Sequence, residues 1–366
     1  MVTSVRHLGP HWYAAVMGTA ILATAGFRLA PAPLDLWAAL WCLALALLAA
    51  LLTARAVHWA HHRDQARAHL RDPAVAPFYG CLSMALLAVG GGALTVGRAW
   101  TGAAAAVWLG AGLFVAGTAV GLAAAVAVPY LMAVHHRVRL PQASPVWLLP
   151  LVAPMVSAAV GPPLVPWLPA GQARQTLLLA CVALFGLSLL ATSLMLPVVF
   201  ARLLTGGPLP LALTPTLFLV LGPLGQSTTA AGQFADVAPG VLPAPYAEGF
   251  RALAVLYGVP VMGFALLWCA LATAHVLRAR RLGMRFTMTW WAFTFPVGTC
   301  VTGADSLTRH TGLAAFGWLA AGLYAVLAAA WAVAAAHTAR GLVSGALLAG
   351  PRPAPVAPRP VTARTR

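Results

Sequence analysis

Long apolar runs, separated by short segments that carry the charges, constrain the fold of this chain more than any other feature. Only 8% of its 366 residues are charged, 61% are hydrophobic, and the mean hydropathy is +0.87. A water-soluble domain needs a far higher density of charge on its surface. Since each run approaches the roughly 20 apolar residues that span a bilayer, the sequence predicts an all-α polytopic membrane protein.

The apolar runs are bounded by Arg, His, Pro or Gly and predict ten transmembrane helices. They cover residues 12–27, 35–53, 75–96, 102–132, 145–161, 176–200, 211–231, 250–276, 286–307 and 313–339. Short loops would join them as five helical hairpins in one transporter domain, residues 1–343, with no length left for a soluble domain. Residues 344–366 are rich in Pro and Arg, and we expect them to form a disordered cytoplasmic tail.

The basic residues predict how the chain is oriented in the membrane. All 22 are arginine. The N-terminus and the loops after even-numbered helices hold 17 of them, and the loops after odd-numbered helices hold Arg28, Arg98, Arg174, Arg251 and Arg309. Basic residues concentrate on the cytoplasmic side, so both termini are predicted there, in a plasma membrane. This orientation explains the net charge of +16 without nucleic acid as a partner.

The absence of lysine excludes a Walker A phosphate loop, a Schiff-base cofactor and a lysine nucleophile. No nucleophile-base arrangement is visible either, so the sequence predicts that the chain is not an enzyme and has no cofactor. The cysteines lie in five different apolar runs without metal-binding spacing, as expected of small core residues. They are Cys42, Cys81, Cys181, Cys269 and Cys300.

Histidines gather near the end of the second predicted helix. His58, His61 and His62 have i, i+3, i+4 spacing, and His69 would lie two helical turns beyond His62. A metal site is one interpretation of this spacing. A pH-sensitive basic surface is the interpretation that we favour, and no metal ligand is assigned.

Three motifs resemble a known family of membrane proteins. They are residues 9–19 (GPHWYAAVMGT) in the first predicted helix, 222–227 (GPLGQS) in the seventh and 290–296 (WWAFTFP) in the ninth. In these motifs the chain resembles the tellurite-resistance/dicarboxylate transporter family, which is related to plant slow anion channels, and the resemblance extends over residues 9–340. It implies five odd-numbered helices around a central anion pore, five even-numbered helices outside them, and a homotrimer.

The resemblance also implies a gate and a class of substrate. A phenylalanine before the ninth-helix proline closes the pore in relatives, and Phe295 matches it; the alternative is that Phe295 only packs. The substrate would be a small anion, either a malate-like C4-dicarboxylate or a tellurite-type oxyanion. Sulfite export and inorganic-anion conduction are the alternatives within transport. A membrane scaffold and an enzyme are the alternatives outside it.

Polar residues within the apolar runs are candidates for the anion pathway. None of the six acidic residues falls clearly at mid-membrane, although Asp305, near the outer end of the ninth helix, comes close, and this favours anions over cations. A dehydrated anion needs neutral hydrogen-bond donors instead. The candidates are Gln226, Ser227, Thr19, Ser157, Thr294 and Thr299. Each hydroxyl group could instead bond to a carbonyl of its own helix.

Glycine and proline in the odd-numbered helices predict helix breaks along that pathway. Freed backbone groups within a membrane must be satisfied by neighbours or by water, as happens beside a polar pore. The predicted breaks are Gly18, Gly91, Pro154, Pro223 and Pro296. The outer arginines, Arg251 among them, would form an outer vestibule that concentrates anions, or would be snorkelling helix ends.

Overall fold

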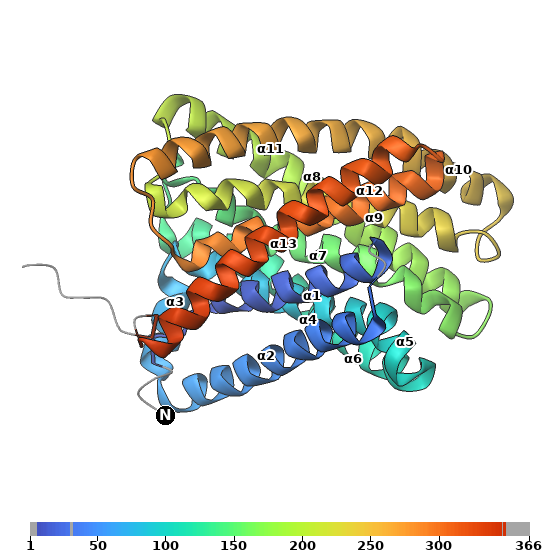
Figure 1. Cartoon of the computed structure of the whole chain (residues 1–366), viewed down its shortest axis with the longest axis horizontal. Coiled ribbons are helices and arrows are strands. Elements are labelled where there is room, and N and C mark those ends of the chain that lie inside the picture. Colours follow the sequence, from blue (N-terminus) through green and yellow to red (C-terminus); the bar gives the residue numbers. More distant parts are fainter. Residues whose placement is uncertain (1–5, 30–31, 346, 349–366) are drawn as a thin grey trace, which may run out of the picture.

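The computed structural model describes residues 6–29, 32–345 and 347–348. In these residues the regular structure is helical, with one isolated bridge between Pro239 and Leu242. Figure 1 shows one bundle, in which the start of α1 and the C-terminal end of α13 lie at the same end. The prediction of an all-α chain is confirmed. Most of the predicted tail, residues 346 and 349–366, lies outside the described residues.

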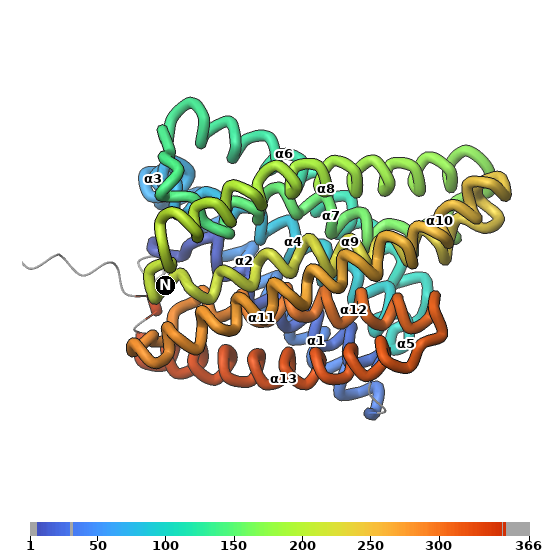
Figure 2. Tube along the Cα trace, turned by 90° about the horizontal axis from the view of Figure 1, so that it is seen from above, coloured from blue at the N-terminus to red at the C-terminus, as the bar shows by residue number. Residues whose placement is uncertain are grey.

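Long helices with exposed apolar surfaces form the outside of the bundle. Figure 2 shows several of them along its flanks. Only 17% to 28% of their most apolar stretches is buried. Trp108 and Trp318 lie on these surfaces and are 81% and 78% exposed, respectively, as expected of side chains that face lipid. The outer helices are α2 (Leu34–His61), α6 (Ala103–Leu131), α8 (Gln172–Gly206), α11 (Gly258–Arg281) and α13 (Ala314–Val343).

Shorter helices, buried on nearly all sides, form the inside of the bundle. They are α1 (Tyr13–Leu29), α4 (Tyr79–Gly92), α7 (Leu149–Val160), α9 (Leu221–Val237) and α12 (Phe295–Thr311). A 3-10 segment precedes each of them: η2 (Pro10–Trp12), η3 (Ala76–Phe78), η7 (Pro145–Leu148), η9 (Leu211–Val220) and η10 (Met288–Phe293). Proline is tolerated at the start of a helix, because the N–H groups of the first turn have no hydrogen-bond partner within the helix.

Short helical elements complete the chain at the two ends of the bundle. The polar helix α3 (Arg63–Arg71) follows α2, and α10 (Ala244–Leu256) precedes α11. The others are η4 (Ala93–Gly97), α5 (Arg98–Thr101), η5 (Met132–His136), η6 (Leu140–Gln142) and η8 (Pro162–Trp167).

Six helical segments of the described chain are long and apolar enough to cross a membrane. They are the five outer segments and Ala76–Thr101, which contains α4. The α-helical parts of α1, α7, α9 and α12 have only 12 to 17 residues, since a 3-10 segment replaces the first turns of each. The count of ten spans in five hairpins, and the cytoplasmic position of both termini, therefore stay predictions.

Tryptophans on the outer helices form hydrogen bonds with the inner ones. The indole Nε1 of Trp41 on α2 donates to the carbonyl of Val89 at 3.1 Å, and that of Trp268 on α11 donates to the carbonyl of Leu217 at 2.9 Å. Trp331 on α13 donates to Oγ1 of Thr19 at 3.0 Å. Each bond satisfies a donor that would be costly in hydrocarbon, and so fixes an outer helix against the inner ones.

Candidate functional site

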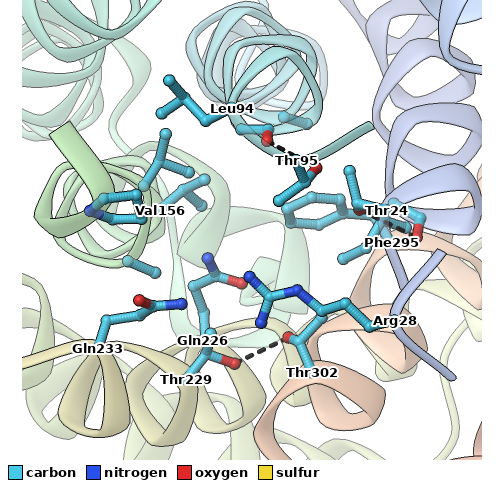
Figure 3. A pocket seen from close by; sticks show the side chains of 16 residues that line it. Thr24, Arg28, Leu94, Thr95, Val156, Gln226, Thr229, Gln233, Phe295 and Thr302 are labelled. Carbon is cyan, nitrogen blue, oxygen red and sulfur yellow. Dashed lines mark hydrogen bonds between the residues drawn. The ribbon is translucent and has the colours of Figure 1, made fainter. Parts of the chain in front are cut away.

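The inner helices enclose a cavity of about 90 Å³, which we call the outer cavity because its mouth lies at the predicted outer end of the bundle. Figure 3 shows polar side chains from several helices around it. All five inner helices contribute to its lining, which includes Thr24 and Arg28 of α1, Gly91 of α4, Val156 of α7, Gln226, Thr229 and Gln233 of α9, and Phe295 and Thr302 of α12.

A second cavity of about 40 Å³, the inner cavity, lies toward the 3-10 segments at the other end of the inner helices. Its walls are mostly apolar and include Met17, Met84, Val152 and Leu219. Of the described residues, Phe295 alone lines both cavities, and its side chain is buried. The ring at the start of α12 therefore stands between the two.

The threonines of the outer cavity donate their protons to the backbone. Thr24 bonds to the carbonyl of Ala20 at 3.1 Å, and Thr95 to that of Gly91 at 3.0 Å. The hydroxyl groups of Thr229 and Thr302 bond to each other at 2.8 Å, and each also lies 3.0 Å from a carbonyl oxygen of its own helix, so their protons are used within the protein. A hydroxyl group has one proton, so these groups present mainly lone pairs to the cavity.

Two amides and a guanidinium group are the donors that the outer cavity offers. Figure 3 shows Gln226, Gln233 and Arg28 pointing into it. Both glutamines are more than nine-tenths buried, and neither side-chain amide bonds to another residue of the described chain. Gln226 was predicted from the sequence and Gln233 was missed, although the spacing of seven residues, two helical turns, places both on one face of α9.

Charged residues surround the mouth of the outer cavity in a balanced network. Arg28 lies 3.8 Å from Asp305, which also lies 3.7 Å from Arg309. Arg309 pairs with Asp236 at 2.7 Å, and His310 lies 3.2 Å from the same carboxylate. Because the arginines face two carboxylates, the mouth is less positive than the count of outer arginines suggests. Arg28 is the arginine that reaches the cavity itself.

The other predicted donors lie in the protein interior but line neither cavity. Thr294 donates to the carbonyl of Trp291 at 2.7 Å, and Ser157 accepts a hydrogen bond from Thr118 at 2.9 Å. Three more donate to carbonyls of their own helices: Thr19 to Ala15, Ser227 to Leu224 and Thr299 to Pro296. These three hydroxyl groups therefore bond to carbonyls of their own helices, which is the alternative that the sequence left open. Arg251 is exposed on α10 and also lines neither cavity.

The residues predicted to break helices take two kinds of position. Helices α1, α4 and α7 continue through Gly18, Gly91 and Pro154. Gly18 and Gly91 instead allow close packing, against Thr294 and Val160 respectively, although α4 does widen into the π segment η4 directly after Gly92. Pro223 and Pro296 lie in first turns, where a 3-10 segment passes into an α-helix.

The predicted histidine cluster forms in part at the end of α2. The ring of His58 is fully buried, with its centroid 5.3 Å from that of His69 and 6.2 Å from that of His62. Burial, and then the positive charge of Arg55, lower the pKa of His69. His61 points to its own helix, with Nδ1 3.2 Å from the carbonyl of Val57. The described residues contain no group of three or more potential ligands placed to hold a metal ion.

Comparisons with known proteins agree with the geometry of the bundle. The family described as SLAC1, voltage-dependent anion channel, matches residues 7–339. An uncharacterized transporter of Methanocaldococcus jannaschii is 26% identical over 354 residues, which are 94% of this chain and 96% of that protein. The sulfite efflux pump SSU1 of Arthroderma otae is 30% identical over 233 residues, which are 62% of this chain and 61% of the pump.

The family match covers nearly the whole described chain, and it includes all three motifs that suggested the resemblance. Multi-pass helices with lipid-type surfaces and a cavity lined by uncharged amides are consistent with anion transport. The chain belongs to the SLAC1 family of voltage-dependent anion channels and is a membrane anion transporter or channel of that family.

Proposed function

We propose that this chain moves compact oxyanions, of the sulfite or tellurite kind, through the two cavities with Phe295 as the gate. The observation that carries the proposal is the position of Phe295, whose ring lines both cavities while all five inner helices surround them. A hydrophobic constriction between two cavities excludes ions until it opens.

The donors of the outer cavity support an anion as the cargo. An anion that leaves water must replace its lost hydrogen bonds, and the amides of Gln226 and Gln233 would supply them at short range. Arg28 would add a positive charge at the mouth. Among the residues that the structure describes, no acidic side chain lines either cavity, which would leave a cation without a counter-charge.

The size of the outer cavity favours compact oxyanions over larger ones. Its volume is about 90 Å³. A sulfite ion fits that volume more readily than malate does, and three of the relatives are sulfite efflux pumps. A C4-dicarboxylate, which the sequence motifs favour, is the second candidate and would need the cavity to widen.

Flux into liposomes that contain the purified protein tests the function. Sulfite, malate and chloride would be supplied in parallel, with protein-free liposomes as the control. We expect sulfite to pass faster than malate. Flux of malate alone would show that the substrate is a dicarboxylate and not an oxyanion. No flux of any anion, with Phe295 either present or truncated, would reject transport.

We further propose ten spans, both termini in the cytoplasm, a plasma-membrane location and a homotrimer. The start of α1 and the end of α13 lie at the same end of the bundle in Figure 1, and this and the sorting of the arginines support the topology. Single cysteines at Ala60, at the end of α2, and at Ala173, at the start of α8, should react with impermeant reagents from opposite sides of the membrane, in a background without the native cysteines. Reaction from one side would contradict the ten-span topology.

A further inference from the structure

A third cavity, of about 290 Å³, lies beside the 3-10 segments at the end of the bundle where the described chain begins. It is larger than the two cavities on the axis and adjoins the inner one at Phe78. Its walls come from the chain after α3, from η6 and η7, and from the end of α8 and the start of η9. Neither the sequence motifs nor the proposed pathway assigns a role to it.

Ser144 lines this cavity with a hydroxyl group that is buried without a hydrogen-bond partner in the described chain. The residue is only 6% exposed. A buried hydroxyl group without a partner costs free energy that a bound ligand would recover. The unpartnered group therefore points to a ligand with a polar end.

Arg202 supplies a positive charge to the same cavity. The residue is 9% exposed, its Nε donates to the carbonyl of Pro141 at 3.2 Å, and its Nη1 donates to the carbonyl of Gly207. These two bonds fix the plane of the guanidinium group. No salt bridge joins Arg202 to an acidic residue within the described ranges. A nearly buried cation without a carboxylate partner favours an anionic ligand.

The remaining walls are apolar and include Phe78, Trp147 and Leu213. The cavity is about three times as large as the outer cavity, enough for one ring or one branched chain with an acidic group. A purely inorganic anion would leave most of the apolar wall uncovered, and a neutral hydrocarbon would leave the guanidinium group unpaired.

We propose that this cavity is a binding site for a small amphipathic monoanion, whose carboxylate or similar group would meet Arg202 and Ser144 while its apolar body fills the space against Trp147 and Leu213. The site is separate from the outer cavity and its donors. The proposal does not depend on which anion is transported, because binding can be measured without transport.

Thermal unfolding of the full-length protein in detergent tests this proposal with benzoate as the probe. Benzamide, which has nearly the same shape and no charge, is the matched control, and ionic strength is held constant. We expect a saturable rise of Tm with benzoate and an apparent affinity for benzamide that is lower by about tenfold or more, since a charge-assisted pair with Arg202 is lost. Equal effects of the two compounds, or no effect of benzoate, would overturn the proposal.

Variants locate the bound benzoate. Arg202→Gln removes the positive charge. Ala74→Phe fills the cavity but keeps Arg202 and Ser144, so it tests the site even if Arg202→Gln does not fold. Both should lose the stabilisation by benzoate, as judged on samples that elute as folded protein in size-exclusion chromatography. Arg28→Gln, in the outer cavity, should keep it. Stabilisation that survives in Ala74→Phe, or disappears in Arg28→Gln, would place benzoate elsewhere.

Discussion

The outer and inner cavities lie on opposite sides of one ring but differ in chemistry. The outer cavity exposes two buried amides and the guanidinium group of Arg28, whereas the inner cavity exposes methionine, leucine and valine side chains. His11 reaches the inner cavity, but burial, and then the charge of Arg55, lower its pKa to about 4, so its ring is neutral at pH 7. The outer cavity therefore offers more groups that can replace the hydration of an anion than the inner cavity does. The barrier to an anion should therefore lie at Phe295 and in the inner cavity.

Truncation of the ring between the cavities should have the largest effect. We expect Phe295→Ala to join the two cavities and raise anion flux per folded protein by about tenfold, which corresponds to a barrier lower by about 1.4 kcal/mol. Flux into liposomes measures it. If Phe295 only packs, the truncation should instead cost about 3–5 kcal/mol of folding free energy without added flux.

Phe293 is the matched control for this variant. It lies two residues earlier, packs edge-on against Phe218 with ring centroids 5.0 Å apart, and lines neither cavity. Phe293→Ala should lower stability without raising flux. An equal rise of flux in both variants would show a loosened bundle rather than an opened gate.

Loss of an amide from the outer cavity should have the next largest effect. Gln226→Leu and Gln233→Leu each remove donors to a dehydrated anion, and a hydrogen bond to a charged group contributes about 1.5–3 kcal/mol. We expect flux to fall by about tenfold or more, at every ionic strength. Thr229→Val is the control, since that hydroxyl group is already bonded within the protein, to the carbonyl of Gly225 and to the hydroxyl group of Thr302. A larger loss in Thr229→Val would contradict our assignment of the donors.

Removal of the charge at the mouth should have a smaller effect that depends on salt. Arg28 acts on an approaching anion through a field that is screened over a Debye length of about 8 Å at physiological ionic strength. Arg28→Gln should lower flux a few-fold at low salt and little at high salt. Arg251→Gln, on the exposed face of α10, should change flux less than Arg28→Gln does. A larger effect of Arg251→Gln would indicate that Arg251, and not Arg28, forms the vestibule.

Acidification should lower the stability of the protein through His11, which is buried beside the inner cavity. The pKa of His11 falls from 6.5 to about 4 in the folded chain, so between these values the unfolded chain binds a proton that the folded chain does not. The free energy of unfolding is therefore unaffected by His11 above pH 6.5 and falls as the pH drops from 6.5 toward 4. His11→Gln should lack this loss in Tm measurements, whereas His61→Gln should retain it. Identical pH profiles for the wild type and His11→Gln would refute the assignment.

Hydropathy and arginine placement predict the helical membrane fold, because the cost of placing polar groups in lipid acts on whole segments. The side of an inner helix that faces the axis is harder to predict. An inner helix is buried on nearly all sides, so the distribution of its apolar residues does not mark its inward face. Ser227 and Gln226 are neighbours in sequence, yet only Gln226 lines the cavity. Gln233 could have been found from its spacing to Gln226, but the pairing of Arg28 with Asp305 depends on contacts between helices.

The outer cavity shortens the distance over which a membrane voltage acts. Where water can enter, the potential changes little, so most of the voltage should fall across the thin apolar layer at Phe295 and the inner cavity. A monovalent anion that crosses this layer gains or loses about 2.3 kcal/mol per 100 mV. One side chain, without any charge of its own, would thus stand at the steepest part of the electric field, and opening it would turn membrane potential directly into anion current.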